Sequence, residues 1–307
     1  MNVRFPLITV LGPTAVGKTS FAAHLASELG AEILSADSRQ VFRSMDIGTG
    51  KDLEDYRIHD HIIPSHLIDI AEPGTEYSVF QFQRDFETAY APIGSRGNVP
   101  ILCGGTGLYL ESVLLGYDLN HAPVNLALRD ELALLNDEEL VARLLSFRHL
   151  HNSTDTLDRE RLIRAIEIEK HKQFDKNLHG HYDFRDTPVF GLRFERKMQR
   201  ERITTRLSQR FGNGLTEEVR HLLDLGISAE RLKMYGLEYK YITMYLEGEL
   251  NFDQMFLLLN TAIHQFAKRQ MTWFRRMEKK GIVITWLDGE DGLKLNLQKA
   301  LALLKSG

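Results

Sequence analysis

The chain has 307 residues and a mass of 35.2 kDa, enough for about two domains and a large buried core. Hydrophobic residues make up 43% and charged residues 26%, which excludes wholesale disorder, and no apolar run is long enough for a transmembrane helix. The net charge of −4 argues against a generally basic protein, the single cysteine excludes an intrachain disulfide, and the N-terminal residues show no signal-peptide pattern, so we expect a cytoplasmic protein.

The first part of the chain alternates short apolar runs with amphipathic helical patterns. Residues 7–11 predict a buried strand, and apolar positions spaced three and four apart predict a helix after Gly17 that ends at Gly30. Residues 33–36 and 99–103 predict two more strands, the second followed by a helix from Leu108. This alternation predicts an α/β fold with a parallel sheet covered by helices on both faces.

The pattern changes near Asn120. Residues 125–173 predict only helices, with leucines supplying the apolar faces. A strand is predicted again at 187–193, helices follow through Arg276, and 282–286 predicts a last strand. We therefore predict an α/β core over 1–119 and 188–307, interrupted by an all-helical insertion domain over 120–187.

A phosphate-binding motif follows the first predicted strand. Its residues match the pattern G-x-x-x-x-G-K-[ST] in full, between a strand and a helix: Gly12, Pro13, Thr14, Ala15, Val16, Gly17, Lys18 and Thr19. The glycines allow backbone N–H groups to turn toward a phosphate, Lys18 adds a positive charge, and the Thr19 hydroxyl is a ligand for Mg²⁺. A diphosphate-bearing ligand, bound by a P-loop NTPase-like sheet, is the prediction.

The strand predicted at 99–103 does not end in an acidic residue. In a nucleotide hydrolase, the corresponding strand would end in an acidic residue that binds the metal ion. Residues 99–103 run instead into Gly104, Gly105 and Thr106. This favours a kinase, or a transferase with a pyrophosphate leaving group, over an ATP-driven motor.

Two polar residues follow predicted strands, and ligands of open parallel sheets bind at this edge. Asp37 follows the second strand and Thr106 the strand at 99–103, so both are expected to face the crevice around Lys18. A carboxylate there is able to orient an attacking amine or hydroxyl and accept its proton. Asp37 fits the role of a turn residue equally well. Thr106, taken alone, fits a turn residue at the start of a helix.

Basic residues gather in three segments. The clusters lie within residues 193–210, 268–276 and 159–164, the second interleaved with Trp273 and Phe274, and Arg161 and Arg164 are one helical turn apart. Each cluster alone fits a solvated helix face. Three of them in a chain of negative net charge favour a polyanionic partner such as RNA.

The ordered set of motifs resembles the tRNA dimethylallyltransferase (tRNA isopentenyltransferase, IPP transferase) family over nearly the whole chain. Besides the motif at 12–19, the segments that carry the resemblance are residues 35–38, 45–49, 67–70, 104–106, 161–167 and 268–275. The last of these, Lys-Arg-Gln-x-Thr-Trp-Phe-Arg, is highly specific. The resemblance implies that the helical insertion grips a tRNA anticodon stem-loop.

The resemblance also implies the reaction and its residues. A dimethylallyl group passes from dimethylallyl diphosphate, held with Mg²⁺, to the exocyclic N6 amine of an adenosine adjacent to the anticodon, and diphosphate is released. Asp37, Thr106 and Arg210 match catalytic positions, residues 12–19 match the diphosphate site, and Thr19 matches the metal position. The matched tRNA-binding residues are Asp37, Ser38, Arg39, Gln40, Glu160, Arg161, Leu162, Ile163, Arg164, Lys268, Arg269, Gln270, Trp273 and Arg275. We expect a monomer.

The chain departs from the family at one implied tRNA contact, the segment 233–238. Gly236-Leu237-Glu238 stands where Gly-Tyr-Arg is common, so that an anion replaces a cation. Either the contact is lost or the segment acts through its backbone.

Alternative functions also fit the residues. They are a small-molecule kinase, a transferase that prenylates free adenine nucleotides, and an RNA-binding module with a vestigial nucleotide site. His59, His61 and His66 lie within eight positions of each other, and histidines with such loose spacing are more often solvent-exposed or structural than part of a metal site.

Overall fold

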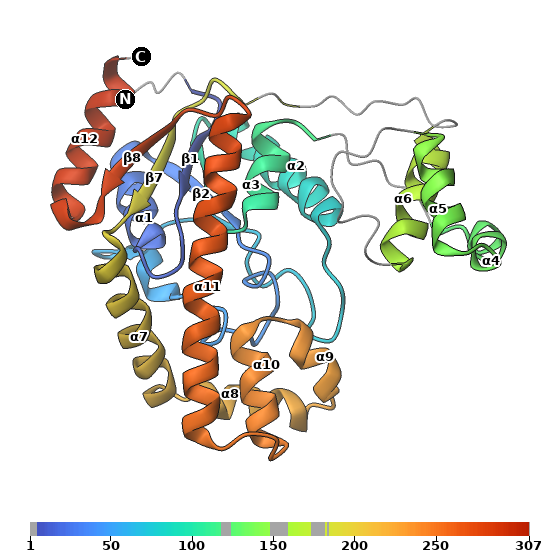
Figure 1. Cartoon of the computed structure of the whole chain (residues 1–307). Helices are drawn as coiled ribbons and strands as arrows, with labels where there is room; N and C mark the ends of the chain where they lie inside the picture. The colour runs from blue at the N-terminus through green and yellow to red at the C-terminus, as the bar shows by residue number, and fades with distance from the viewer. Residues whose placement is uncertain (1–4, 118–123, 148–158, 173–181, 183, 307) are drawn as a thin grey trace. The chain divides into compact units, whose positions relative to one another are not determined.

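The computed structural model describes residues 5–117, 124–147, 159–172, 182 and 184–306 (Figure 1). The chain divides into two compact units, residues 1–116 with 182–307 and residues 117–181. The second unit begins and ends a few residues earlier than the insertion predicted over 120–187. Its end differs because Phe184 is buried and packs edge-on against Phe86 in the core of the first unit.

The first unit is built on one parallel six-stranded sheet in the order β5-β2-β6-β1-β7-β8. Its strands are β1 (Ile8–Leu11), β2 (Ala31–Ala36), β5 (Ser65–His66), β6 (Val99–Gly104), β7 (Val189–Arg193) and β8 (Ile284–Asp288). The central strands are buried on both faces, which is why they read as continuous apolar runs. A short antiparallel pair, β3 (Arg57–Ile58) with β4 (His61–Ile62), lies outside this sheet.

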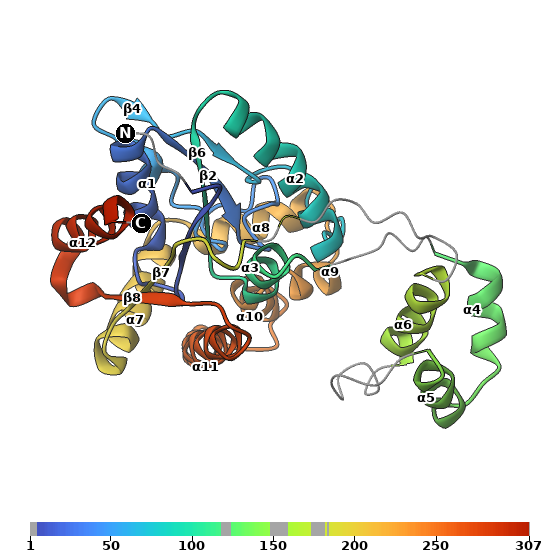
Figure 2. The same ribbon diagram turned by 90° about the horizontal axis from the view of Figure 1, so that it is seen from above.

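Helices cover both faces of the sheet (Figures 1 and 2). On one face α1 (Lys18–Leu29) packs on β1, β2 and β6, and α12 (Gly292–Ser306) packs on α1 and β8. On the other face lie α2 (Val79–Ser95), α3 (Gly107–Leu114) and the C-terminal part of α11 (Phe252–Lys279). In the described residues, the 3₁₀ turns η1 (Leu53–Tyr56) and η3 (Gly289–Asp291) lie in connecting segments. The predicted P-loop-like α/β fold, with helices on both faces, is confirmed.

A group of helices extends from the carboxyl edge of the sheet (Figure 1). It consists of α7 (Arg196–Gly212), α8 (Leu215–Asp224), α9 (Ala229–Met234), α10 (Leu237–Leu246) and the N-terminal part of α11. These helices share an apolar core with Val41, Phe42 and Met45, which lie in the loop after β2. One long helix, α11, therefore joins this core to the core under the sheet.

The second unit contains α4 (Leu126–Ala133), α5 (Asp137–Leu145) and α6 (Arg159–Lys172). Its small core consists of Leu128, Leu132, Leu140, Leu144, Leu162, Ala165 and Ile166. The leucine pattern predicted these helices. In the described parts of both units, none of the helices is long and apolar enough to cross a bilayer.

Candidate active site at the carboxyl edge of the sheet

The register of three neighbouring strands places the predicted site residues together. Gly104 at the end of β6 pairs with Leu11 of β1 on one side and with Ala36 of β2 on the other. The next residues along the three strands are Gly105, Gly12 and Asp37. The phosphate-binding loop, the Asp37 turn and the Gly-Gly-Thr turn therefore leave the sheet side by side, at the edge where parallel sheets bind ligands.

The loop at 12–19 adopts its shape through close packing of its backbone. A Cβ at Gly12 would lie 2.6 Å from the carbonyl oxygen of Leu192, so only glycine fits there. Gly17 precedes α1 with φ 82° and Ala15 has φ 65°, both in the left-handed region. Arg202 on α7 fixes this turn, because its Nε donates to the carbonyl oxygen of Ala15 at 2.9 Å.

Lys18 lies at the first position of α1, inside the loop. Its Nζ donates to the carbonyl oxygen of Pro13 at 3.0 Å. Burial lowers the pKa of Lys18, and the negative charge of Asp37 acts in the opposite direction. The Lys18 ammonium has lost part of its hydration and lies next to a helix N-terminus. A bound phosphate would supply the negative charge that stabilises it.

The Asp37 turn is tied to the Gly-Gly-Thr turn by Thr106. The Oγ1 atom of Thr106 accepts from the backbone N–H of Ser38 at 3.0 Å and donates to Ser38 Oγ at 3.3 Å. Asp37 Oδ1 accepts from the backbone N–H of Arg39 at 2.9 Å, which makes Asp37 a turn residue. Its second oxygen has no hydrogen bond to the described residues, so the turn role leaves one oxygen for a substrate.

Gln270 on α11 bridges the two glycine turns. Its Oε1 accepts from the backbone N–H of Thr14 at 2.9 Å, and its Nε2 donates to the carbonyl oxygen of Gly105 at 2.8 Å. A Cβ at Gly105 would lie 2.5 Å from this amide nitrogen, so a larger residue there would displace the Gln270 amide. Gln270 was predicted by resemblance as a tRNA contact, but its side chain is buried inside this bridge.

Two arginines of α7 lie against the loop that ends at Asp52. Arg206 forms an ion pair with Asp52, and Arg210 lies against Gly50, where a Cβ would collide with its guanidinium. The charges of Arg206 and Asp52 act on both Lys18 and Arg210. Arg210, predicted from the family, is thus part of one charged neighbourhood with the phosphate-binding loop.

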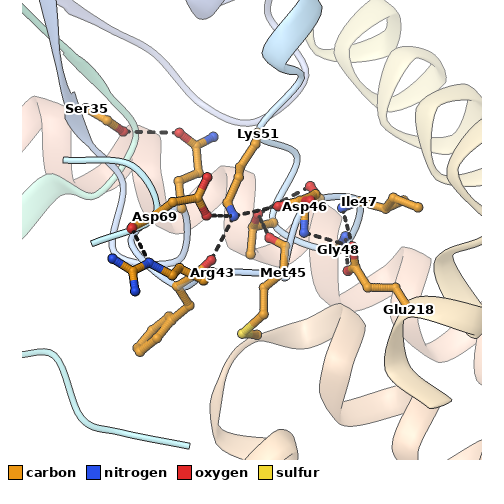
Figure 3. Close-up of polar contacts among 12 residues, drawn as sticks. Ser35, Arg43, Met45, Asp46, Ile47, Gly48, Lys51, Asp69 and Glu218 are labelled. Atoms are coloured by element: carbon orange, nitrogen blue, oxygen red, sulfur yellow. Dashed lines mark hydrogen bonds and ion pairs between the residues drawn. The ribbon is translucent and has the colours of Figure 1, made fainter. Parts of the chain in front are cut away.

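The loop between Asp37 and Asp52 is fixed by buried polar contacts (Figure 3). Lys51, completely buried, donates to the carbonyl oxygen of Phe42 at 2.7 Å and pairs with Asp46 and Asp69. Gln40 accepts from Ser35 Oγ at 3.1 Å and donates to the carbonyl oxygen of Gly50 at 3.0 Å. The Gln40 side chain, predicted as a tRNA contact, therefore positions this loop.

A carboxylate from α8 holds the same loop from its other side. Glu218 accepts hydrogen bonds from the backbone N–H groups of Asp46, Ile47 and Gly48 at 2.6 to 2.9 Å (Figure 3). Tyr239 donates to Glu218 at 2.7 Å and packs where a Cβ at Gly48 would stand. Lys51 and Glu218 were not predicted from the sequence. The one sequence feature that pointed to this loop was the family segment at 45–49, to which no role was assigned.

The basic surface of α11 continues away from the crevice. Lys268, Arg269 and Arg275 are exposed, and Trp273 packs closely on Gly107 with Arg276 over its ring. Lys268 and Arg275 line a cavity of about 770 Å³ that Arg193, Arg196 and Arg200 also border. Arg193 is the last residue of β7, within the strand predicted at 187–193, and α7 begins at Arg196.

The predicted RNA-binding segment 160–164 belongs to the second unit. Glu160 and Arg161 are exposed, and Arg164 pairs with the buried Glu167 at 3.0 Å. Leu162 is only 1% exposed and packs in the core of this unit, with Ile163 against it. A side chain buried in this way does not reach a ligand, so Leu162 acts by supporting the helix that displays its neighbours.

The histidine cluster is not a metal site in the described residues, where no group of three metal-ligating side chains occurs. Nε2 of His66 instead donates to the carboxylate of Glu32 at 2.7 Å. The lone Cys103 is buried, and burial raises the pKa of its thiol to about 12. It is therefore protonated at neutral pH and is not a nucleophile.

The fold and the loop at 12–19 define a P-loop protein of the α/β class, in which Lys18 lies beside an aspartate that has one carboxylate oxygen available. Comparison with known proteins narrows this class. A family model described as IPP transferase matches residues 40–277, and one described as isopentenyl transferase matches residues 5–57. The chain belongs to the IPP transferase family, as its motifs predicted.

Individual relatives agree with this assignment. The chain is 56% identical over 284 residues to "tRNA dimethylallyltransferase 2" of Bacteroides fragilis, covering 92% of this chain and 93% of that one. It is 52% identical to the protein of the same name from Phocaeicola vulgatus, covering 98% of both. The crystal structure of the full-length tRNA isopentenylpyrophosphate transferase from Bacillus halodurans superimposes with a TM-score of 0.69 at 30% identity, covering 98% of this chain and 97% of that one. The predicted enzyme class, a tRNA prenyltransferase, is confirmed.

Proposed function

We propose that this enzyme transfers a dimethylallyl group from dimethylallyl diphosphate to the exocyclic N6 amine of an adenosine adjacent to a tRNA anticodon, with release of diphosphate. The observation that carries the proposal is the strand register, which sets the loop of Lys18 beside Asp37 and Thr106. The names of the most similar relatives support tRNA as the acceptor.

The donor's diphosphate fits the cationic side of the crevice. Loop N–H groups, Lys18 and Arg210 stabilise the negative charge that develops as the bond between the allylic carbon and the diphosphate oxygen breaks. The bonding electrons leave with the diphosphate. Because the allylic carbon carries positive charge well, the main task of these residues is to stabilise the leaving group.

A magnesium ion is the cofactor that this site fits. Thr19 offers a hard oxygen ligand in the first turn of α1, and it is partly exposed beside Lys18. Mg²⁺ usually completes its shell with substrate phosphates and water, so one hydroxyl ligand beside a bound diphosphate fits such a site. When bound, the ion neutralises charge on the diphosphate.

Asp37 serves the acceptor side. The adenine amine is a weak nucleophile, since its lone pair is delocalised into the ring. The free oxygen of Asp37 accepts a hydrogen bond from this amine, orients it toward the allylic carbon and takes its proton as the nitrogen–carbon bond forms. Thr106 holds the Asp37 turn in place through Ser38.

The RNA is held by basic surface on both units. The exposed cations of α11 and of the segment 160–164 supply contacts to the phosphate backbone. The base has to leave the anticodon-loop stack, which costs a few kcal/mol. We propose that the enzyme acts as a monomer in the cytoplasm; light scattering tests the monomer.

The test is incubation with labelled dimethylallyl diphosphate and either tRNA or AMP, followed by mass analysis of the anticodon-loop adenosines. Label on N6 of a tRNA adenosine supports the proposal. Label on AMP alone identifies a free-nucleotide transferase. Phosphate transfer from ATP without prenyl transfer identifies a kinase, and no transfer even in a single turnover identifies an RNA-binding module.

A further inference from the structure

The carboxylate of Glu238 lies inside the protein, at the first turn of α10. Its side chain is 17% exposed, and its Oε1 lies 3.4 Å from Nη1 of Arg210, whose side chain is 13% exposed. Burial raises the pKa of Glu238 and lowers the pKa of Arg210, while each charge opposes the shift of the other. The two groups form an ion pair that is largely removed from solvent.

The guanidinium of Arg210 has few other constraints. It stacks closely on the backbone of Gly50, and its Nε is buried without a hydrogen-bond partner among the described residues. Glu238 supplies the one ion pair described for Arg210. A long arginine side chain has many rotamers, so a single buried partner determines where its remaining N–H groups lie.

The pair belongs to the diphosphate crevice. The charge of Arg206 acts on Arg210, Glu238 and Lys18, and the charge of Asp37 acts on both Lys18 and Glu238. Glu238 is therefore a largely buried side chain near Lys18 and Asp37, in the region where the leaving group is expected. An anion is also poorly suited to contact RNA phosphates.

We propose that Glu238 is a positioning residue for the reaction: it holds Arg210 so that the unpaired N–H groups of the guanidinium meet the donor's diphosphate. This inference rests on the proposed function. It also explains the departure at 236–238, because the segment contributes a carboxylate to the crevice where an arginine contact to tRNA was expected.

The test is calorimetric titration of the full chain with inorganic pyrophosphate and Mg²⁺. Glu238→Ala should weaken binding roughly tenfold, the effect of losing the partner of a buried charge. Glu238→Gln should bind at least as tightly as the wild type, because its amide oxygen still accepts from Arg210 and the negative charge is gone. Glu247→Ala is the matched control, since it removes an ion pair at the other end of α10.

A double-mutant cycle separates positioning from a merely structural role. With Arg210→Ala already present, Glu238→Ala should cause no further loss of pyrophosphate affinity. Pyrophosphate binding by Glu238→Ala equal to the wild type, or an equal loss in the Arg210→Ala background, overturns the inference. If Glu238→Ala does not fold, Glu238→Leu replaces it, with similar volume and no acceptor.

The outcomes also separate this inference from the proposed function. A wild-type protein that does not bind pyrophosphate contradicts the diphosphate site itself, and the inference with it. A wild-type protein that binds pyrophosphate and prenylates tRNA, with unchanged binding in Glu238→Ala, overturns the inference alone. A rise in the KM for tRNA without a change for the donor assigns Glu238 to RNA contact instead.

Discussion

Gln270 and Thr14, 256 positions apart, are joined by a hydrogen bond of 2.9 Å between the glutamine Oε1 and the backbone N–H of the phosphate-binding loop. The other end of the same amide holds the carbonyl oxygen of Gly105. A helix that carries the basic surface thus determines the shape of the loop. This hydrogen bond connects α11, which we expect to bind RNA, to the loop at 12–19, which we expect to bind the donor.

Replacing Gln270 with alanine should therefore damage donor binding more than RNA binding. The change leaves two buried backbone groups unpaired, at about 1–3 kcal/mol for each unsatisfied group, so we expect the KM for dimethylallyl diphosphate to rise roughly tenfold or more. Steady-state kinetics and a filter-binding assay with tRNA measure the two effects. Gln265→Ala, on the exposed side of the same helix, is the control. A loss confined to tRNA affinity would contradict the bridge and restore the role expected from resemblance.

Asp37→Ala should reduce turnover by roughly two or more decades and leave tRNA affinity nearly intact, because the general base is lost while the RNA surface stays. Asp37→Asn separates the two roles of this side chain. Asparagine keeps the acceptor for the N–H of Arg39, so the turn is preserved, but it does not take a proton. Single-turnover rates are the measurement. An active Asp37→Asn enzyme would show that Asp37 only shapes the turn.

Local patterns were sufficient to predict the core of the fold. The apolar run before Gly12 and the helical spacing after Gly17 are properties of adjacent residues, and Gly30 ends α1 in the left-handed conformation as expected. The two-residue strand β5 and the helix α12 were not predicted. β5 is too short to show a period, and it exists because Ser65 and His66 pair with Ile33 and Leu34 of β2.

Only the site residues that belong to a motif or directly follow a predicted strand could be predicted from the sequence. Lys18, Asp37 and Thr106 follow strands, so their meeting at one edge follows from a parallel sheet. The partners that fix them come from distant segments: Gln270 reaches Thr14, and Glu218 reaches the loop at 46–48. No spacing in the sequence encodes these contacts, because they depend on how α8 and α11 pack.

Binding of tRNA should weaken steeply with salt, since contacts to the phosphate backbone release counterions. Arg275→Gln should lower the affinity and make the slope of log affinity against log salt shallower by about 1. Fluorescence anisotropy at several salt concentrations measures both. Arg220→Gln removes the same charge from an exposed position on α8 and should leave the slope unchanged. Equal slopes for the wild type and Arg275→Gln would remove Arg275 from the RNA surface.

Glu32 provides a pH-dependent test of the fold. This buried carboxylate accepts two hydrogen bonds from Arg96, at 2.9 and 2.7 Å, and others from Asn98 and His66. The hydrogen bonds from Arg96 are the main reason that its pKa falls to about 2, from 4.5 for the free group. Because the folded-state pKa is depressed, the stabilisation is complete above about pH 4.5 and is lost as the pH falls toward 2.

Glu32→Gln should therefore lower the free energy of unfolding by about 3 kcal/mol at neutral pH, and by progressively less between pH 4.5 and 2. Urea denaturation at a series of pH values gives the difference between the two proteins. Glu28→Gln, exposed on α1, serves as the control. A difference that stays constant down to pH 2 would mean that the ionised form of Glu32 does not supply this stability.

Leu162→Ala tests the helical unit separately from the catalytic core. Leu162 is 1% exposed and packs in a core that contains six other buried residues among those described. Its truncation should lower the free energy of unfolding of this unit by about 2–5 kcal/mol, a large share of the stability that so small a core supplies. We expect this unit to become sensitive to proteolysis and tRNA affinity to fall, while pyrophosphate still binds to the core. Leu134→Ala removes the same atoms from a side chain that is 87% exposed and should change neither property. If tRNA binds equally well to the Leu162→Ala protein after its helical unit has unfolded, the helices do not grip the RNA, and the exposed cations of α11 carry that role alone.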